Sequence, residues 1–198
     1  MEPRITELAS HPGIRRRPFV DSASLGMALF VFTEVMLFAG MISAFVINQA
    51  GAPAGNWPPP GQPRLPIERT GLNTAALLAS GACLLVASRR FRGPEPARAA
   101  SWMGAAMALG AFFVIFQGAE WIALLGQGLT ITSSQMGSFF YLIVGTHALH
   151  AVAAILALAM AWRSLRAGTL TRARLGAVSL FWYFVVLVWP VLYWKVYL

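Results

Sequence analysis

The sequence predicts an all-α, polytopic membrane protein in which five transmembrane helices form a bundle. Hydrophobic residues make up 58% of the 198-residue chain and charged residues 11%, against about 25% charged residues in an ordinary soluble domain. Five apolar segments reach or approach the roughly 20 helical residues needed to cross a hydrocarbon core. This composition excludes a soluble globular protein, and the 13 Phe and 7 Trp residues exclude a disordered chain.

The predicted spans cover residues 22–48, 72–88, 99–125, 136–162 and 175–198, so that residues 21–198 form one transmembrane domain. Residues 1–20 are polar and contain prolines, which predicts a cytoplasmic tail. Six prolines and four glycines in residues 51–71 predict an extended loop between the first two spans.

The basic residues predict the orientation of the chain. The formal net charge is +8, and 12 of the 15 Lys and Arg residues lie in the tail and in the segments 89–98 and 163–174. The other three lie in the segments that face the opposite side. Cytoplasmic segments of membrane proteins carry this excess, so we expect a cytoplasmic N-terminus and an external C-terminus. Because the clusters flank apolar runs, they favour membrane topology over nucleic-acid binding.

Ionisable side chains occur at depth within the predicted spans. Glu34 lies near the middle of the first span, and His147 and His150 project from one face of the fourth. Their distances along the helices place Glu34 and His150 at one depth. Tyr183 of the fifth span lies slightly nearer the cytoplasm. We therefore expect a buried polar cluster of Glu34 and His150 to which Tyr183 contributes its hydroxyl.

A second polar pair, Gln117 and Glu120, lies in the outer half of the third span, where Glu120 is expected to approach the interface. Two interpretations of all these groups stay open. They can act as hydrogen bonds that fix helix packing, or they can take part in a proton-linked process.

The sequence predicts no catalytic residue, metal site or redox cofactor within this chain. Its single cysteine, Cys83, cannot form a disulfide or zinc cluster alone. His147 and His150 share one helix face, whereas a bis-histidine haem needs ligands on opposite sides. Repeated Glu-x-x-His pairs, a dinucleotide-binding glycine motif, a phosphate-binding loop and a nucleophile elbow are not found.

Three segments of the chain resemble subunit III of the haem-copper oxidases, the cytochrome c oxidase subunit 3 family, in its short five-helix bacterial form. Residues 25–45 are similar to the family segment that contains SEVMxFxG, with Glu34 on its acidic position. Residues 117–121, QGAEW, resemble the Q-x-x-E-[WY] element, with Glu120 on its glutamate. Residues 137–154 resemble the element that ends in G-x-H-x-x-H-V, with His147 and His150 on its histidines.

The last span departs from this pattern. Many family members carry W-H-F-V-D-x-x-W, where residues 182–189 read WYFVVLVW, so that Tyr183 replaces the histidine and Val186 the aspartate. The departure leaves open an accessory subunit of a nitric oxide reductase. A small proton-coupled transporter stays open as well, because it would also use a membrane-embedded Glu.

The resemblance implies a subunit without metal that packs on the catalytic subunit I of a terminal oxidase, with subunit II and other respiratory complexes as further partners. It implies that the subunit supports stability and proton uptake while oxygen is reduced to water. Haem and copper are expected in the partner subunits, and nucleic acid is not expected as a partner. The resemblance and the dominance of Arg over Lys favour a bacterial inner membrane, where basic residues at the cytoplasmic headgroup level can bind phospholipid: Arg15, Arg16, Arg17, Arg89 and Arg90.

Overall fold

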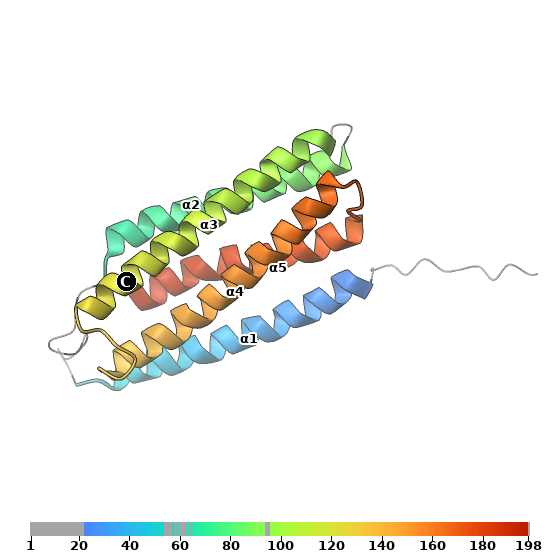
Figure 1. Ribbon diagram of the computed structural model, residues 1–198. Helices are drawn as coiled ribbons and strands as arrows, with labels where there is room; N and C mark the ends of the chain where they lie inside the picture. Colours follow the sequence, from blue (N-terminus) through green and yellow to red (C-terminus); the bar gives the residue numbers. More distant parts are fainter. Residues whose placement is uncertain are drawn as a thin grey trace, which may run out of the picture.

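In a computed structural model, the chain forms a bundle of long, roughly parallel or antiparallel helices (Figure 1). The structure describes residues 22–53, 57, 59, 63, 65–93 and 96–197. Within these ranges the elements are α1 (Ser22–Gly51), α2 (Ile67–Arg92), α3 (Pro96–Gly126), α4 (Gln135–Arg166), α5 (Arg172–Leu192) and a π-helical turn, η1 (Tyr193–Tyr197). Five of these segments are long and apolar enough to cross a membrane, which confirms the predicted all-α, five-helix fold.

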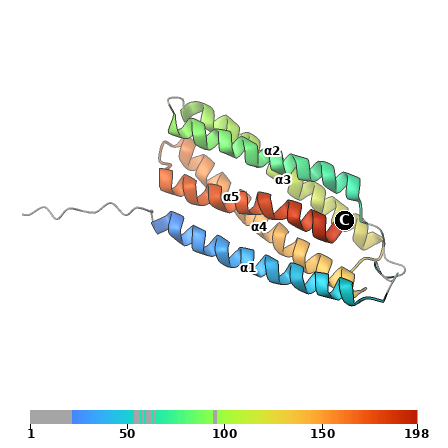
Figure 2. The ribbon, with the colours of Figure 1, turned by 180° about the vertical axis from the view of Figure 1, so that it is seen from behind.

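Helix α5 lies at the centre of the bundle and α1 lies at its edge. Figure 2 shows α5 between the α2–α3 pair and α1, and α5 packs against α1, α2 and α4. In the most apolar part of the span formed by residues 172–197, 61% of the residues are buried, whereas in the most apolar part of α1 only 11% are. Most of the apolar surface of α1 is therefore left for contacts outside this chain.

Most helices extend a few residues beyond the predicted spans, and α2 does so at both ends. Helix α2 begins five residues earlier than residue 72 and ends four residues later than residue 88, because its ends are polar and a hydropathy pattern does not include them. Glu68 in its first turn and Arg89, Arg90 and Arg92 in its last turn complement the helix dipole. The predicted loop 51–71 is thus wrong for residues 67–71, which are helical.

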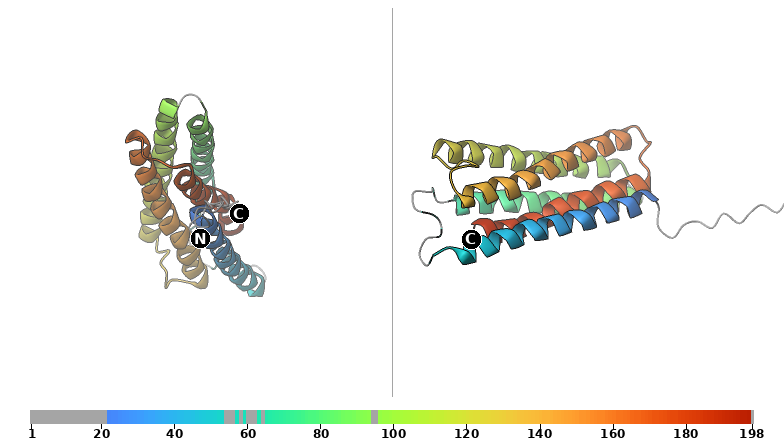
Figure 3. Two further views of the ribbon diagram at one scale, coloured as in Figure 1. Left: turned by 90° about the vertical axis from the view of Figure 1, so that its right-hand side faces the viewer. Right: turned by 90° about the horizontal axis from the view of Figure 1, so that it is seen from below.

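The described basic residues gather at one end of the bundle. The start of α1, the α2–α3 connection and the α4–α5 connection all lie at this end, and the C-terminus lies at the other (Figures 1 and 3). Eight arginines stand at the helix ends that meet there: Arg89, Arg90, Arg92, Arg98, Arg163, Arg166, Arg172 and Arg174. Among the described residues, Arg69 and Lys195 are the basic residues near the opposite end. The predicted tail, residues 1–20, lies outside the described residues.

Candidate functional site

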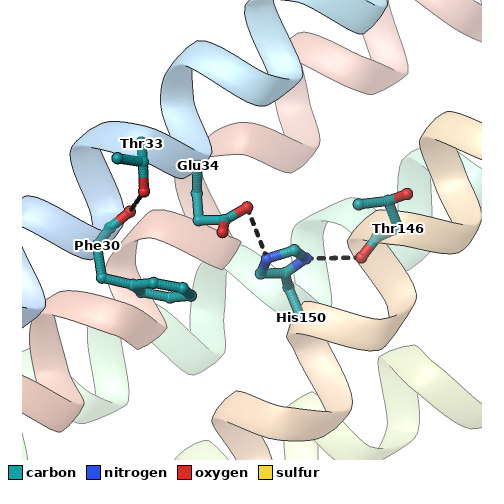
Figure 4. A network of polar contacts seen from close by, with 5 residues as sticks. All are labelled: Phe30, Thr33, Glu34, Thr146 and His150. Carbon is teal, nitrogen blue, oxygen red and sulfur yellow. Dashed lines mark hydrogen bonds and ion pairs between the residues drawn. The ribbon is translucent and has the colours of Figure 1, made fainter.

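The structure brings Glu34 of α1 and His150 of α4 together in the middle of the bundle. Oε2 of Glu34 lies 3.0 Å from Nε2 of His150 (Figure 4). The side chains are 16% and 12% exposed, respectively. Both residues lie near the middle of their helices, where an unpaired charge would cost at least about 2.5–3.5 kcal/mol in a membrane. Each group thus provides the polar partner that the other needs at this depth.

The second ring nitrogen of His150 defines how protons are arranged in this pair. Nδ1 lies 2.8 Å from the backbone carbonyl oxygen of Thr146. A carbonyl accepts hydrogen bonds and cannot donate, so Nδ1 carries a hydrogen. A proton on Nε2 would make the pair a carboxylate facing an imidazolium, and a proton on Glu34 instead would make it a carboxylic acid facing a neutral imidazole. A proton can move between the two groups without changing the net charge of the pair.

Four phenylalanine rings surround His150. The ring centroids of Phe38, Phe184, Phe181 and Phe30 lie 5.6, 5.9, 6.2 and 6.5 Å from that of the imidazole. They come from α1 and α5, so both helices help to enclose the pair. This apolar enclosure lowers the local dielectric constant and strengthens the electrostatic interaction between Glu34 and His150.

Tyr183 does not join Glu34 and His150. Its side chain instead lines an apolar groove of about 380 Å³ between α1 and α5. The walls of this groove include Val35 and Phe38 from α1 and Leu187 from α5. In the described part of the chain, the central cluster therefore consists of a carboxyl and an imidazole without the phenol.

His147 lies one turn before His150 on α4 but has a different environment. It is 1% exposed, and aromatic rings pack around it, with centroid distances of 5.0 Å to Trp189, 6.1 Å to Phe113 and 6.3 Å to Phe38. Neither ring nitrogen has a hydrogen-bond partner among the described residues. Leaving such a buried polar group unpaired costs about 1–3 kcal/mol, so His147 requires an explanation beyond packing.

Glu120 is held inside the bundle by α2. It is 7% exposed, and Thr70 Oγ1 donates a hydrogen bond of 3.0 Å to its Oε2. Thr70 thus provides a polar partner for Glu120 inside the bundle, and the approach of Glu120 to the membrane interface stays a prediction. The hydropathy pattern does not indicate Thr70 as the partner of Glu120.

Near Glu120, further side-chain hydrogen bonds connect α2, α3 and the C-terminal π-helical turn η1. Asn73 Nδ2 donates to the Phe113 carbonyl at 3.2 Å and lies 3.4 Å from Gln117 Oε1. Gln117 Nε2 donates to the hydroxyl of Tyr197 at 3.0 Å. The one-face spacing of Thr70, Asn73 and Thr74 in α2 was the available sequence signal for this network.

Trp189 connects α5 to α2 by a hydrogen bond. Its indole Nε1 donates to Thr74 Oγ1 at 2.8 Å, and Thr74 Oγ1 donates to the backbone oxygen of Thr70 at 2.7 Å. Trp189 thus serves as a buried hydrogen-bond donor. The half of the bundle that contains the C-terminal turn is fixed by side-chain hydrogen bonds as well as by apolar packing.

Two of the five candidate lipid-binding arginines lie in the part of the chain that the structure describes. Arg89 and Arg90 are exposed in the last turn of α2, where a headgroup can approach them. Arg15, Arg16 and Arg17 lie outside the described residues. Across the described ranges, no three His, Cys, Asp or Glu side chains come close enough to hold a metal ion.

The fold and these buried groups define a polytopic, helical membrane protein whose polar residues are organised between helices. A family model described as cytochrome c oxidase subunit III matches residues 5–198. The chain therefore belongs to the cytochrome c oxidase subunit III family.

Individual relatives agree with this assignment. The chain is 32% identical over 182 residues to cytochrome c oxidase subunit 3 of Synechocystis, covering 90% of this chain and 76% of the relative. It is 32% identical over 188 residues to a probable cytochrome c oxidase subunit 3 of Nocardia farcinica, covering 89% and 88%. The human cytochrome c oxidase subunit 3 is 30% identical over 201 residues, covering 98% and 76%.

Proposed function

We propose that this chain is the non-redox subunit III of a bacterial respiratory haem-copper oxidase, where it packs on the catalytic subunit and supports its stability and proton uptake. The family match across residues 5–198 carries this proposal. It favours the oxidase over the nitric oxide reductase and the transporter, which gain no support from the comparisons. Membership of the family also implies a multi-subunit oxidase complex and a multi-pass membrane location.

The exposed surface of α1 supports a direct contact with a large membrane partner. This helix leaves many large apolar side chains exposed, among them Leu29, Phe32, Met36 and Ile47 at 61, 64, 60 and 71%. The Glu34–His150 pair on the inner side of α1 is also partly exposed. A protein helix can cover a partly exposed ionisable pair with polar groups, which lipid tails lack. We assign this partner to subunit I.

Purification of the native complex tests the assignment. The chain would be tagged at its C-terminus in its native host and purified gently in detergent, and the co-purifying chains would be identified. We expect a large polytopic partner that contains copper, subunit II, and haem bands in a reduced-minus-oxidised spectrum. Haem b with non-haem iron would instead indicate a nitric oxide reductase. A colourless single chain would contradict both.

The role of Glu34 can be tested by two substitutions. Glu34→Ala removes the partner of His150 Nε2, whereas Glu34→Gln keeps a donor at this position but cannot release a proton. We expect Glu34→Ala to leave electron transfer mostly intact and to weaken assembly or lifetime during turnover. Glu68→Gln is the matched control, because Glu68 is exposed in the first turn of α2.

The comparison of the Gln and Ala variants distinguishes the two roles of the pair. A normal lifetime in Glu34→Gln would mean that the hydrogen bond is what matters, and a lifetime as short as that of Glu34→Ala would mean that proton exchange matters. Complete loss of oxygen reduction in a normally assembled Glu34→Ala complex would contradict a supporting role.

The bacterial inner membrane and a cytoplasmic N-terminus are part of this proposal. The eight described arginines at one end of the bundle support the orientation. Arg89 and Arg90 would then lie at the level of anionic headgroups. Alkaline phosphatase fused to the C-terminus tests the orientation, because this enzyme is active only outside the cytoplasm. An inactive, normally expressed fusion would contradict it.

A further inference from the structure

The Glu34–His150 pair is open to the outside of the bundle on one side. The side chains of Glu34 and His150 are 16% and 12% exposed. The groove between α1 and α5 does not account for this exposure, because neither residue belongs to its walls. Phe181 and Phe184 of α5 also cover the imidazole from that direction. The exposed edge of the pair therefore lies on the other side of α1, along the seam where α1 meets α4.

Exposed apolar and small side chains flank the pair along this α1–α4 seam. On α1, Leu37 lies one turn from Glu34 and is 47% exposed. On α4, Leu149 directly precedes His150 and is 70% exposed, and Ala153 lies one turn further along and is also exposed. A small residue such as alanine lets a neighbouring helix approach closely in a membrane. The described part of the chain thus leaves room for another helix over the pair.

The exposed edge of the pair requires a hydrogen-bond donor. A carboxyl group offers about four acceptor positions, and among the described residues His150 is the polar group that contacts Glu34 (Figure 4). Lipid tails contain no donor, and ionisable side chains within membrane spans almost always face protein or water. Both protonation arrangements described above leave the pair electrically neutral. The missing donor is therefore expected to be uncharged, because a cation would add a net charge at this depth.

On the basis of the proposed function, we propose that a transmembrane helix of the catalytic subunit crosses the α1–α4 seam and donates a hydrogen bond from an uncharged side chain to Glu34. Ser, Thr, Asn, Gln, Tyr and Trp side chains are donors of this kind. Leu37 and Leu149 provide the apolar flanks of the contact, and Ala153 gives the incoming helix space. The pair then determines where the two subunits meet in the membrane.

Site-specific photocrosslinking in membranes of the native host tests the location of this contact. A benzophenone amino acid would replace Leu149 in the tagged full-length chain. Ile115 of α3 is the matched control position, because it is 72% exposed and also lies near the middle of its helix. Helices α3 and α1 lie on opposite sides of α5 (Figure 2). We expect position 149 to capture the catalytic subunit several-fold more than position 115.

The outcomes separate this contact from the proposed function. Equal capture at both positions in a complex that still co-purifies would overturn the seam contact and leave the proposed function intact. If no catalytic subunit co-purifies at all, both are overturned.

The donor is tested on the captured helix. Mass spectrometry identifies the crosslinked segment, and the donor side chain nearest the crosslink would be changed to Ala. We expect this change to make the purified complex dissociate several-fold faster, and to have no further effect when Glu34→Ala is already present. Independent effects of the two changes would overturn the hydrogen bond, and so would a captured segment without a donor within one helical turn of the crosslink.

A larger side chain at the seam provides a steric test. Ala153→Trp would fill the space at the α1–α4 seam, and Ala108→Trp is the matched control, because Ala108 is exposed near the middle of α3. We expect Ala153→Trp to lower the amount of co-purifying catalytic subunit several-fold and Ala108→Trp to leave it unchanged. Equal amounts in the two variants would contradict a helix crossing at the seam.

Discussion

Replacement of Gly110 by Ala should destabilise the bundle, because Gly110 of α3 faces Trp182 of α5 at very short range. A Cβ atom at this position would lie 2.7 Å from Cζ2 of Trp182 and would also contact Cη2. Carbon atoms pack best at about 3.5–4.0 Å, so the new methyl group would be about 0.8 Å too close. Trp182 is 0% exposed and has no open space into which to turn.

The size of this effect follows from two opposing contributions. Overpacking in a tight core typically costs about 1–3 kcal/mol, whereas Gly→Ala within a helix gains up to about 1 kcal/mol. Gly104→Ala in the same helix provides the matched control, because its Cβ would lie 3.7 Å from Trp162 Nε1, an ordinary contact. The difference between the two variants therefore isolates the overlap with Trp182. We expect Gly110→Ala to be the less stable of the two by about 1–3 kcal/mol.

The assay is the thermal transition of the purified complex, followed by retention of the chain and by near-ultraviolet circular dichroism. For a chain of this length, 1 kcal/mol corresponds to about 2–4 °C. Gly110→Ala should thus melt about 2–12 °C below Gly104→Ala. Equal melting temperatures, or a higher value for Gly110→Ala, would refute the close packing of α3 against α5.

Two further perturbations test individual contacts. Ser134→Ala removes the side-chain acceptor of the Gly137 N–H at the start of α4. We expect the free energy of unfolding to fall by about 1 kcal/mol and hydrogen exchange in the first turn of α4 to become faster. Unchanged exchange would contradict the role of Ser134 as a cap. Trp189→Phe removes the donor to Thr74. We expect the free energy of unfolding to fall by about 0.6–2 kcal/mol. If the losses of Trp189→Phe and Thr74→Val simply add in the double variant, the two side chains form no direct hydrogen bond.

The sequence predicts the number of helices well, because each span is an apolar run long enough to cross a membrane. It predicts helix ends poorly where the chain is polar, as at residues 67–71 and 89–92 of α2. Hydropathy measures preference for lipid, whereas the helix continues as long as its backbone hydrogen bonds are satisfied. A hydropathy pattern does not indicate the π-helical turn that follows Pro190 either.

For the polar side chains, too, the sequence predicts some contacts and not others. Glu34 and His150 could be matched from the sequence because depth along a helix is simple arithmetic. The contact between Thr70 and Glu120 could not, because it depends on the rotation of α2 against α3. The buried nitrogens of His147 could not be foreseen either. His147 and His150 share a helix face, and only the packed neighbours distinguish a paired imidazole from an unpaired one.

The two altered positions of the last span lie in apolar surroundings. Val186, which stands where many family members have aspartate, is 4% exposed, and its Cγ1 lies where a Cβ at Gly81 would approach to 3.0 Å. This tight contact between α2 and α5 has no space for the partners that a carboxylate would require. Tyr183, in place of the histidine, lies in the α1–α5 groove.

Helix α5 contains no acidic residue and no histidine. Its core positions supply apolar contacts and the indole of Trp189 instead of the acid and base of the common pattern. Among the described residues, the carboxyl and imidazole groups near the middle of a helix are Glu34 on α1 and His147 and His150 on α4. The Glu34→Gln variant therefore tests a proton-linked role at the contact between α1 and α4.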